Sequence, residues 1–199
     1  VRATFNFKSY EPVLSFINRR QSKKEKKRGG QKMKKITENT VKDALSGESQ
    51  AHLKYKLYAE QARKENLPNI ARLFEAASLS ELVHARNYLK VLNLEGKTVD
   101  NLDIALQGET FEAEDMYPAY LAVAREQGEN KVATFFQFAL ATEQVHQKLY
   151  ARAKEATRQG QDVELTDVYV CPICGFTMEG EAPDKCPVCG APQNKFVKF

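Results

Sequence analysis

The chain has 199 residues, which is enough for one well-packed domain and one small additional module. Its formal charge of +4 is unevenly distributed: residues 1–32 hold ten Lys and Arg against two Asp and Glu, and the remaining residues hold 20 against 24. The body is therefore mildly acidic, which argues against a nucleic-acid partner for it. No apolar run approaches the roughly 20 residues of a membrane span, so we expect no membrane partner either.

Residues 1–32 differ from the rest of the chain. Residues 23–30 form a run of charge with little to bury, which predicts disorder, and a basic arm for nucleic acid or a membrane is one interpretation. Lys-Arg-Gly-Gly shortly before Met33 is also what a purine-rich ribosome-binding sequence would give if it were translated. We expect the native protein to begin at Met33, with residues 1–32 a mis-assigned extension.

The first two predicted helices span residues 37–65 and 70–94, where apolar and small residues recur every three or four positions. The Asn-Leu-Pro-Asn segment at 66–69 interrupts this pattern and suits a hairpin of two antiparallel helices. A second break at 95–98 predicts a crossover to another helix pair.

The second pair is predicted over residues 99–127 and 130–159. Pro118 lies inside the first of these helices and is expected to kink it, whereas Gly128 and Gly160 end the two helices. Helices of this length are each about 40 Å long. We therefore expect residues 33–160 to form an all-α four-helix bundle.

The end of the chain has a different composition. Residues 161–167 are a polar linker, and residues 168–199 are too short for a helix pair, so they are expected to fold around a metal ion. Two Cys-x-x-Cys pairs supply the ligands: Cys171, Cys174, Cys186 and Cys189. Tetrahedral thiolate ligation fits zinc or iron, and the cysteines alone favour a structural zinc ribbon as much as a redox site. Thiolate ligands without a visible secretory signal predict a cytoplasmic protein.

One motif is written twice in the helical region. Glu-x-x-His occurs at 81–84 and 143–146, and a Gly-Glu pair precedes each copy, ending at Glu48 and at Glu109. The steps from these glutamates to the motifs are 33 and 34 positions, which indicates an internal duplication of a helix pair. Glu on two helices and Glu-x-x-His on the other two is the ligand set of di-iron and di-manganese bundles.

A single Glu-x-x-His is usually a solvated pair on a helix face, but two matched copies favour a metal site. Carboxylates are seldom buried without a partner, and divalent cations would neutralise this cluster. The predicted ligands in the bundle are Glu48, Glu81, His84, Glu109, Glu112, Glu143 and His146. The thiolate tail favours redox-active iron in this site.

These ligands can be given separate roles. One metal would take His84 and the other His146, with Glu81 and Glu143 as bridges. The two glutamates of the Gly-Glu pairs would close one side each, and Glu112 is a carboxylate beyond the minimal set. His52 belongs to neither copy of the motif, and we expect it at the surface or behind the ligands.

The series Gly-Glu-Ser, Glu-x-x-His, Gly-Glu-Thr-x-Glu and Glu-x-x-His, followed by Cys-Pro-x-Cys-Gly and Cys-Pro-Val-Cys-Gly-Ala-Pro, resembles rubrerythrin over residues 33–199. The resemblance implies a ferritin-like bundle with a carboxylate-bridged non-haem di-iron site and a rubredoxin-like tail with one iron. It further implies that Glu112 is an extra carboxylate ligand, which exchanges with His84 as one iron changes oxidation state. Residues 1–32 have no counterpart in this pattern.

The activity implied by the resemblance is an NADH-linked peroxidase that reduces hydrogen peroxide to water and protects against oxidative stress. Electrons would come from an NAD(P)H-dependent rubredoxin reductase, often through free rubredoxin, and pass through the tetrathiolate iron. Family resemblance also implies a homodimer or higher homo-oligomer. Two alternatives are a ferroxidase that stores iron and a binding or sensing module with zinc in the tail.

Overall fold

A computed structural model describes residues 33–199, and the expectations for residues 1–32 lie outside this part of the chain. Within it, residues 33–96 and residues 97–199 form two compact units. No described helix is both long enough and apolar enough to cross a membrane.

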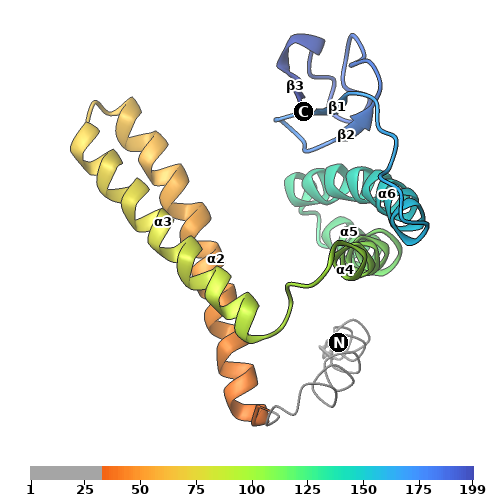
Figure 1. The fold of residues 1–199 in the computed structure, drawn as a ribbon. Coiled ribbons are helices and arrows are strands. Elements are labelled where there is room, and N and C mark those ends of the chain that lie inside the picture. Colours follow the sequence, from red (N-terminus) through yellow and green to blue (C-terminus); the bar gives the residue numbers. More distant parts are fainter. Residues whose placement is uncertain (1–32) are drawn as a thin grey trace. The chain divides into compact units, whose positions relative to one another are not determined.

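The first unit is an antiparallel hairpin of two helices, α2 (Lys35–Lys64) and α3 (Pro68–Val91) (Figure 1). Asn66 at the turn has a positive φ of 59°, which asparagine tolerates, and Pro68 opens α3, where a missing N–H costs little. The buried residues of the hairpin are mostly small, which allows the two backbones to approach closely; they are Ala59, Ala62, Ala71, Ser78 and Ala85. The predicted hairpin is therefore present, with helix ends shifted by one to three residues.

His52 lies at the middle of this hairpin. Its Nδ1 is 2.9 Å from both the hydroxyl and the carbonyl oxygen of Ser78, and the Ser78 hydroxyl donates to the His52 carbonyl at 3.0 Å. Ser78 is buried, so these bonds connect α2 to α3 with little competition from water. His52 therefore holds the hairpin together, a more specific role than the sequence predicted.

The second unit begins with α4 (Thr98–Phe111), a π-helical segment (Glu112–Met116) and α5 (Tyr117–Glu126). The sequence predicted one helix over 99–127 with a kink at Pro118, and the irregularity instead takes the form of this π-helix just before the proline. The Tyr117 N–H bonds to the Glu112 carbonyl, five residues earlier, so the helix is wider where Pro118 lacks an N–H.

The long helix α6 (Asn130–Arg158) follows a turn at Gly128, whose φ of 71° is readily adopted by glycine. It packs along α4 and α5 (Figure 1). A small core between α5 and α6 contains Leu121, Ala124 and Ala133, with Phe136 and Leu140 packed against it.

The tail contains a three-stranded antiparallel sheet of β1 (Val168–Val170), β2 (Thr177–Glu179) and β3 (Val197–Lys198), in the order β2-β1-β3. A 3-10 turn (Gln193–Lys195) precedes β3. Gly175 and Gly190 have φ of 83° and 76° and donate to the Cys171 and Cys186 carbonyls at 2.8 and 2.9 Å. Each Cys-x-x-Cys-Gly segment therefore closes into a tight loop that brings its two sulfurs together.

Strand β2 lies against α6 within the second unit. Glu179 of β2 forms an ion pair with Arg152 of α6 and accepts a hydrogen bond from the Thr166 N–H at 3.0 Å. These two contacts lower the pKa of the Glu179 carboxyl, the backbone bond being the larger cause. The linker and β2 are thus both tied to the same helix by one carboxylate.

Asp103 of α4 is a buried acid at the contact between α4 and α6. Its side chain is 6% exposed, and its Oδ1 lies 2.6 Å from Lys154 Nζ and 3.6 Å from an Arg158 nitrogen. Two cations of α6 thereby compensate one carboxylate of α4. Removing the acid would leave the Lys154 side chain, which is only 19% exposed, without this carboxylate partner.

We predict that Asp103→Ala lowers the free energy of unfolding of the metal-free protein by about 3 kcal/mol. Urea unfolding followed by circular dichroism at 222 nm measures this. Glu155→Ala, an exposed position on the same α6, is the control and should change stability by less than about 0.5 kcal/mol. A loss for Asp103→Ala no larger than that of the control would show that the cluster contributes nothing.

Candidate metal centres

The α2–α3 hairpin brings three of the predicted ligands together. His84 Nδ1 is 2.9 Å from Glu81 Oε2 and 3.7 Å from Glu48 Oε1. One donor atom from each residue lies within 4.8 Å of the other two, close enough to share one ion. The Glu81 and His84 side chains are one helical turn apart on α3, as their spacing predicted, and Glu48 reaches them from α2.

The second copy of the motif forms nearly the same arrangement. His146 Nδ1 is 2.8 Å from Glu143 Oε2 and 3.6 Å from Glu109 Oε2, again with all three donors within 4.8 Å. Glu109 comes from α4 and the other two residues from α6. The duplication that the sequence indicated is therefore reproduced in three dimensions, with the same three residue types at nearly equal donor distances.

Carboxylate crowding is strongest in the second group. Burial, followed by the hydrogen bond and the charge of Glu143, raises the pKa of Glu109 from 4.5 to about 7, although His146 acts in the opposite direction. Burial also raises the pKa of Glu143, assisted by the charge of Glu112. These groups resist becoming anionic together, and a bound cation would remove that cost.

The first group is more exposed, and the hydrogen bond between its two carboxylates, not burial, is the largest cause of their pKa shifts. A hydrogen bond with Glu81 raises the pKa of Glu48, and the same bond, together with His84, lowers the pKa of Glu81. Two carboxylates that share a hydrogen bond in this way hold one proton between them. Metal binding to either group would therefore release protons.

Glu112 is placed close to the second group without joining its three donors. It is the first residue of the π-helix, and its pKa is raised first by burial and then by the charge of Glu109. A π-helical turn often marks a functional position in a helix, since it widens the spacing of side chains. The sequence identified Glu112 as an additional carboxylate, but gave no sign of the π-helix that carries it.

Two tyrosines flank the second group. Burial is the main cause of the raised pKa of Tyr117 and of Tyr150, and the Glu109 and Glu143 carboxylates add to it in both cases. The centroid of the Tyr150 ring lies 6.3 Å from the centroid of the His146 ring. Both hydroxyls therefore remain protonated and can donate to anions beside them.

The four cysteines are free thiols gathered into one cluster. Cys171 Sγ is 3.6 Å from Cys189 Sγ, and Cys174 Sγ is 3.6 Å from Cys186 Sγ. A tetrahedral ion with bonds of about 2.3 Å would separate its sulfurs by about 3.8 Å, so the cluster fits a single thiolate-bound ion. All four predicted cysteine ligands are thus together.

Backbone donors act on these sulfurs unequally. Burial works against ionisation of Cys171, but hydrogen bonds from the N–H groups of Ile173 and Cys174, together with those from the Cys189 and Cys174 thiols, outweigh it and lower its pKa. Burial raises the pKa of Cys174 and of Cys189. A metal ion is what would make all four sulfurs thiolates at neutral pH.

The donors in the helices also suit metal ions. Each group of three offers two carboxylates and one imidazole, a mixed set that iron and manganese accept. Burial is the largest cause that raises the pKa of both Glu109 and Glu143, while the hydrogen bond between them raises the pKa of Glu109 and lowers that of Glu143. Two partly buried carboxylates of this kind gain from a bound cation.

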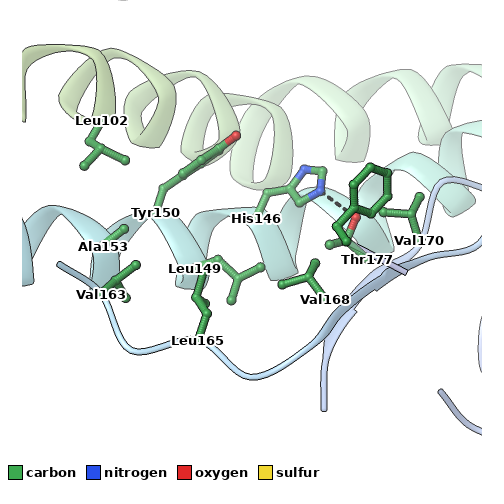
Figure 2. Close-up of a pocket in the computed structure, with 11 residues that line it drawn as sticks. Leu102, His146, Leu149, Tyr150, Ala153, Val163, Leu165, Val168, Val170 and Thr177 are labelled. Carbon is green, nitrogen blue, oxygen red and sulfur yellow. Dashed lines mark hydrogen bonds between the residues drawn. The ribbon is translucent and has the colours of Figure 1, made fainter. Parts of the chain in front are cut away.

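Figure 2 shows a contact that the sequence did not predict: His146 Nε2 lies 2.9 Å from the Thr177 hydroxyl of β2. The two residues line a pocket of about 410 Å³, together with Tyr150 and mostly aliphatic side chains such as Leu149 and Val168. Thr177 follows a Cys-x-x-Cys-Gly segment by two residues, and this position alone does not reveal that it meets a helix 31 residues earlier.

The pH dependence of stability tests the raised pKa of Glu109 in the second group. The raised pKa of Glu109 favours the protonated folded state, so its contribution to stability is complete below pH 4.5 and is lost as pH rises through about 7. Between these pH values the free energy of unfolding of the metal-free wild type should fall by at most about 3 kcal/mol relative to that of Glu109→Gln, whose side chain does not titrate. Saturating Mn²⁺ should remove the difference in pH dependence.

Thermal unfolding of both metal-free proteins from pH 4.5 to 7.5 measures this. The two melting temperatures should diverge as pH rises, with the wild-type protein falling relative to Glu109→Gln. Parallel curves for the two proteins across this range would mean that Glu109 titrates normally.

Comparison with protein families agrees with this geometry. The family model described as rubrerythrin matches residues 39–154, and the model described as rubrerythrin, rubredoxin-like domain, matches residues 169–197. Rubrerythrin-2 of Clostridium acetobutylicum is 38% identical over 82% of this chain and 97% of its own. Nigerythrin of Nitratidesulfovibrio vulgaris is 34% identical over 82% of this chain and 86% of its own.

A solved structure of nigerythrin in its fully reduced, all-ferrous state is 32% identical, covering 82% of this chain and 86% of its own with a TM-score of 0.47. The family models and the curated relatives together confirm the fold class and the cofactor classes expected from the sequence. The chain therefore belongs to the rubrerythrin family of di-iron oxidoreductases, with a ferritin-like di-iron domain and a rubredoxin-like domain whose four clustered cysteines form an iron site.

Proposed function

We propose that this protein is an NADH-linked peroxidase that reduces hydrogen peroxide to water, with electrons delivered through the four-cysteine site. The observation that carries the proposal is the repeated group of two carboxylates and one imidazole, in a chain that also carries a four-thiol cluster. Rubrerythrins are generally peroxide-reducing proteins of oxidative-stress defence, which supports this activity.

The reaction must supply two electrons and two protons for each peroxide, and it yields two water molecules. A pair of ferrous ions supplies the two electrons when it is bound, and NADH restores them through a reductase. We propose that both groups of three ligands hold this pair, with His84 and His146 on different metals. Glu81 and Glu143 are proposed as bridges, and Glu48 and Glu109 as the ligands that close either side.

The chain's own residues can manage the protons. Tyr117 and Tyr150 keep their hydroxyl protons, because burial and the adjacent carboxylates raise their pKa values. These groups can donate hydrogen bonds to peroxide oxygens and deliver protons as the O–O bond breaks.

Glu112 is proposed as a movable carboxylate. Its position at the start of the π-helix places it beside Glu109, outside the group of three donors. We propose that it enters and leaves the metal site in exchange with His84, as the resemblance implies.

The remaining assignments follow from the same family. We propose rubredoxin or an NAD(P)H-dependent rubredoxin reductase as the electron donor, a homodimer or larger homo-oligomer as the assembly, and the cytoplasm as the location. We also propose residues 33–160 as the di-iron domain, 161–167 as the linker and 168–199 as the rubredoxin-like domain.

The route of the electrons can be separated from the peroxide chemistry. In Cys174→Ser, NADH consumption driven by peroxide and a rubredoxin reductase should fall about a hundredfold or more, because the four-thiol site is broken. The chemically reduced variant should still be oxidised by one equivalent of peroxide at the wild-type rate. Ile173→Ala, an exposed neighbour of the cysteine, is the control and should behave as wild type.

Four outcomes would contradict the proposal. If fully iron-loaded wild-type protein did not consume NADH with peroxide, the proposed peroxidase activity would be wrong. If Cys174→Ser consumed NADH as fast as the wild type, the proposed electron transfer through the four-cysteine site would be wrong. Oxidation of many added Fe²⁺ ions per chain by oxygen, with retention of the ferric product, would favour iron storage. A colourless tail that retains zinc in protein from iron-rich cells would favour a binding or sensing module.

Replacing the movable carboxylate gives a second test. Glu112→Ala should keep the helical circular dichroism spectrum of the wild type and slow peroxide reduction about tenfold or more, because one ligand is lost during the redox cycle. Glu114→Ala is the matched control, since Glu114 lies in the same π-helix but is exposed and bonds to Gln147. Stopped-flow oxidation of the ferrous proteins measures the rates, and equal rates for all three would exclude Glu112 from the mechanism.

A further inference from the structure

We propose that the Thr177 hydroxyl is a positioning group for the metal ligand His146: it fixes which ring nitrogen carries the proton and thereby presents Nδ1 to the metal. This inference deepens the proposed function, because it rests on His146 being a ligand. It assigns to the rubredoxin-like domain a role in metal binding by the helical domain, in addition to holding its own iron.

The contact has the geometry of a good hydrogen bond. His146 Nε2 and Thr177 Oγ1 are 2.9 Å apart, and the Thr177 residue is only 7% exposed (Figure 2). On the other side of the same ring, Nδ1 faces the Glu143 and Glu109 carboxylates. The ring is therefore held from both sides, by the tail at one nitrogen and by the ligand group at the other.

A second bond of Thr177 fixes the direction of the first. The Thr177 hydroxyl donates to the Gly175 carbonyl at 3.2 Å, and a hydroxyl has only one proton to give. In this arrangement its oxygen accepts from a protonated Nε2 of His146, and Nδ1, which lies 2.8 Å from Glu143 Oε2, is the ring nitrogen that faces the ligand group. The lone pair of Nδ1 is left for a metal ion, which binds only an unprotonated nitrogen.

The duplicated group provides an internal comparison. Within residues 33–199, the described interactions of His84 all pass through its Nδ1, to Glu81 and Glu48. Its side chain is 48% exposed, whereas that of His146 is 28% exposed. The two halves of the duplication match in their donors and differ in the support given to the imidazole.

The position of Thr177 is itself well determined. Thr177 pairs with Val170 in the sheet. Glu179, two residues further along β2, forms an ion pair with Arg152 of α6. The pocket beside the bond is lined mainly by aliphatic side chains, including Leu149, Val168 and Val170, which offer water few competing partners. A hydrogen bond in such surroundings is stronger than one in water.

Metal affinity tests the proposal without reference to catalysis. The full chain, stripped of metal and given one equivalent of Zn²⁺ for its four cysteines, is titrated anaerobically with Co²⁺ while the visible absorption of the ion is followed. Thr177→Val keeps the shape of the side chain and removes the hydroxyl, and should weaken the tighter Co²⁺ site about tenfold. Thr177→Ser restores the hydroxyl and should bind within about twofold of the wild type.

Two further measurements separate positioning from folding. Thr157→Val removes a hydroxyl from α6 that bonds only to the Ala153 carbonyl, and should leave Co²⁺ affinity unchanged. Nitrogen-15 NMR of the histidine rings in the metal-free protein should show His146 protonated at Nε2 in the wild type and in Thr177→Ser. In Thr177→Val, the same ring should become a mixture of the two neutral forms.

Wild-type affinity in Thr177→Val, or equal weakening in Thr177→Val and Thr177→Ser, would overturn the role of the hydroxyl. Unchanged ring signals in Thr177→Val would overturn it as well. Absence of Co²⁺ binding at the carboxylate–histidine groups in every protein would instead defeat the proposed ligand set, and the NMR measurement would still decide whether Thr177 controls the ring.

Discussion

Negative charge gathered on the faces of partly buried helices is the constraint on which this structure depends. Glu109 and Glu143 lie together beside His146, and burial makes each of them harder to ionise. Such a group is unfavourable unless a proton or a cation compensates it. The same residues that weaken the metal-free helices are the ones we propose as iron ligands, so binding of the ion would stabilise the folded state.

The two helix pairs bring together the same donor set, two carboxylates and one imidazole, in two different environments. Their donor distances agree within 0.1 Å, with Nδ1 of each histidine 2.8–2.9 Å from one carboxylate and 3.6–3.7 Å from another. Their surroundings, as far as residues 33–199 describe them, contain different features: α4 leads into a π-helix, and His146 meets the Thr177 hydroxyl within its own unit. A duplicated element can thus keep its ligands while its two copies acquire separate functions, one more accessible and one more firmly held.

The small domain depends on its metal more directly. Its sheet is short and its cysteine loops are closed by glycine N–H groups, so the four sulfurs are the part that most needs a bound ion. Its contact with α6 adds a structural connection between the two kinds of iron site. Thr177 joins the His146 ring to the carbonyl of Gly175, the residue that follows Cys174. A proposed ligand of one site and a proposed ligand of the other are therefore separated by two hydrogen bonds and one peptide unit.

The sequence by itself determined the helix pairs, the duplicated Glu-x-x-His motifs and the four-cysteine tail, because each depends on spacing along one or two neighbouring elements. Residues three apart on a helix must share a face, and Cys-x-x-Cys-Gly closes on itself. Only the tertiary structure decided that Asp103 is neutralised by Lys154, that His52 locks α2 to α3, and that Thr177 meets His146. These contacts join residues 26 to 51 positions apart, and their partners are set by how elements pack, which local periodicity does not encode.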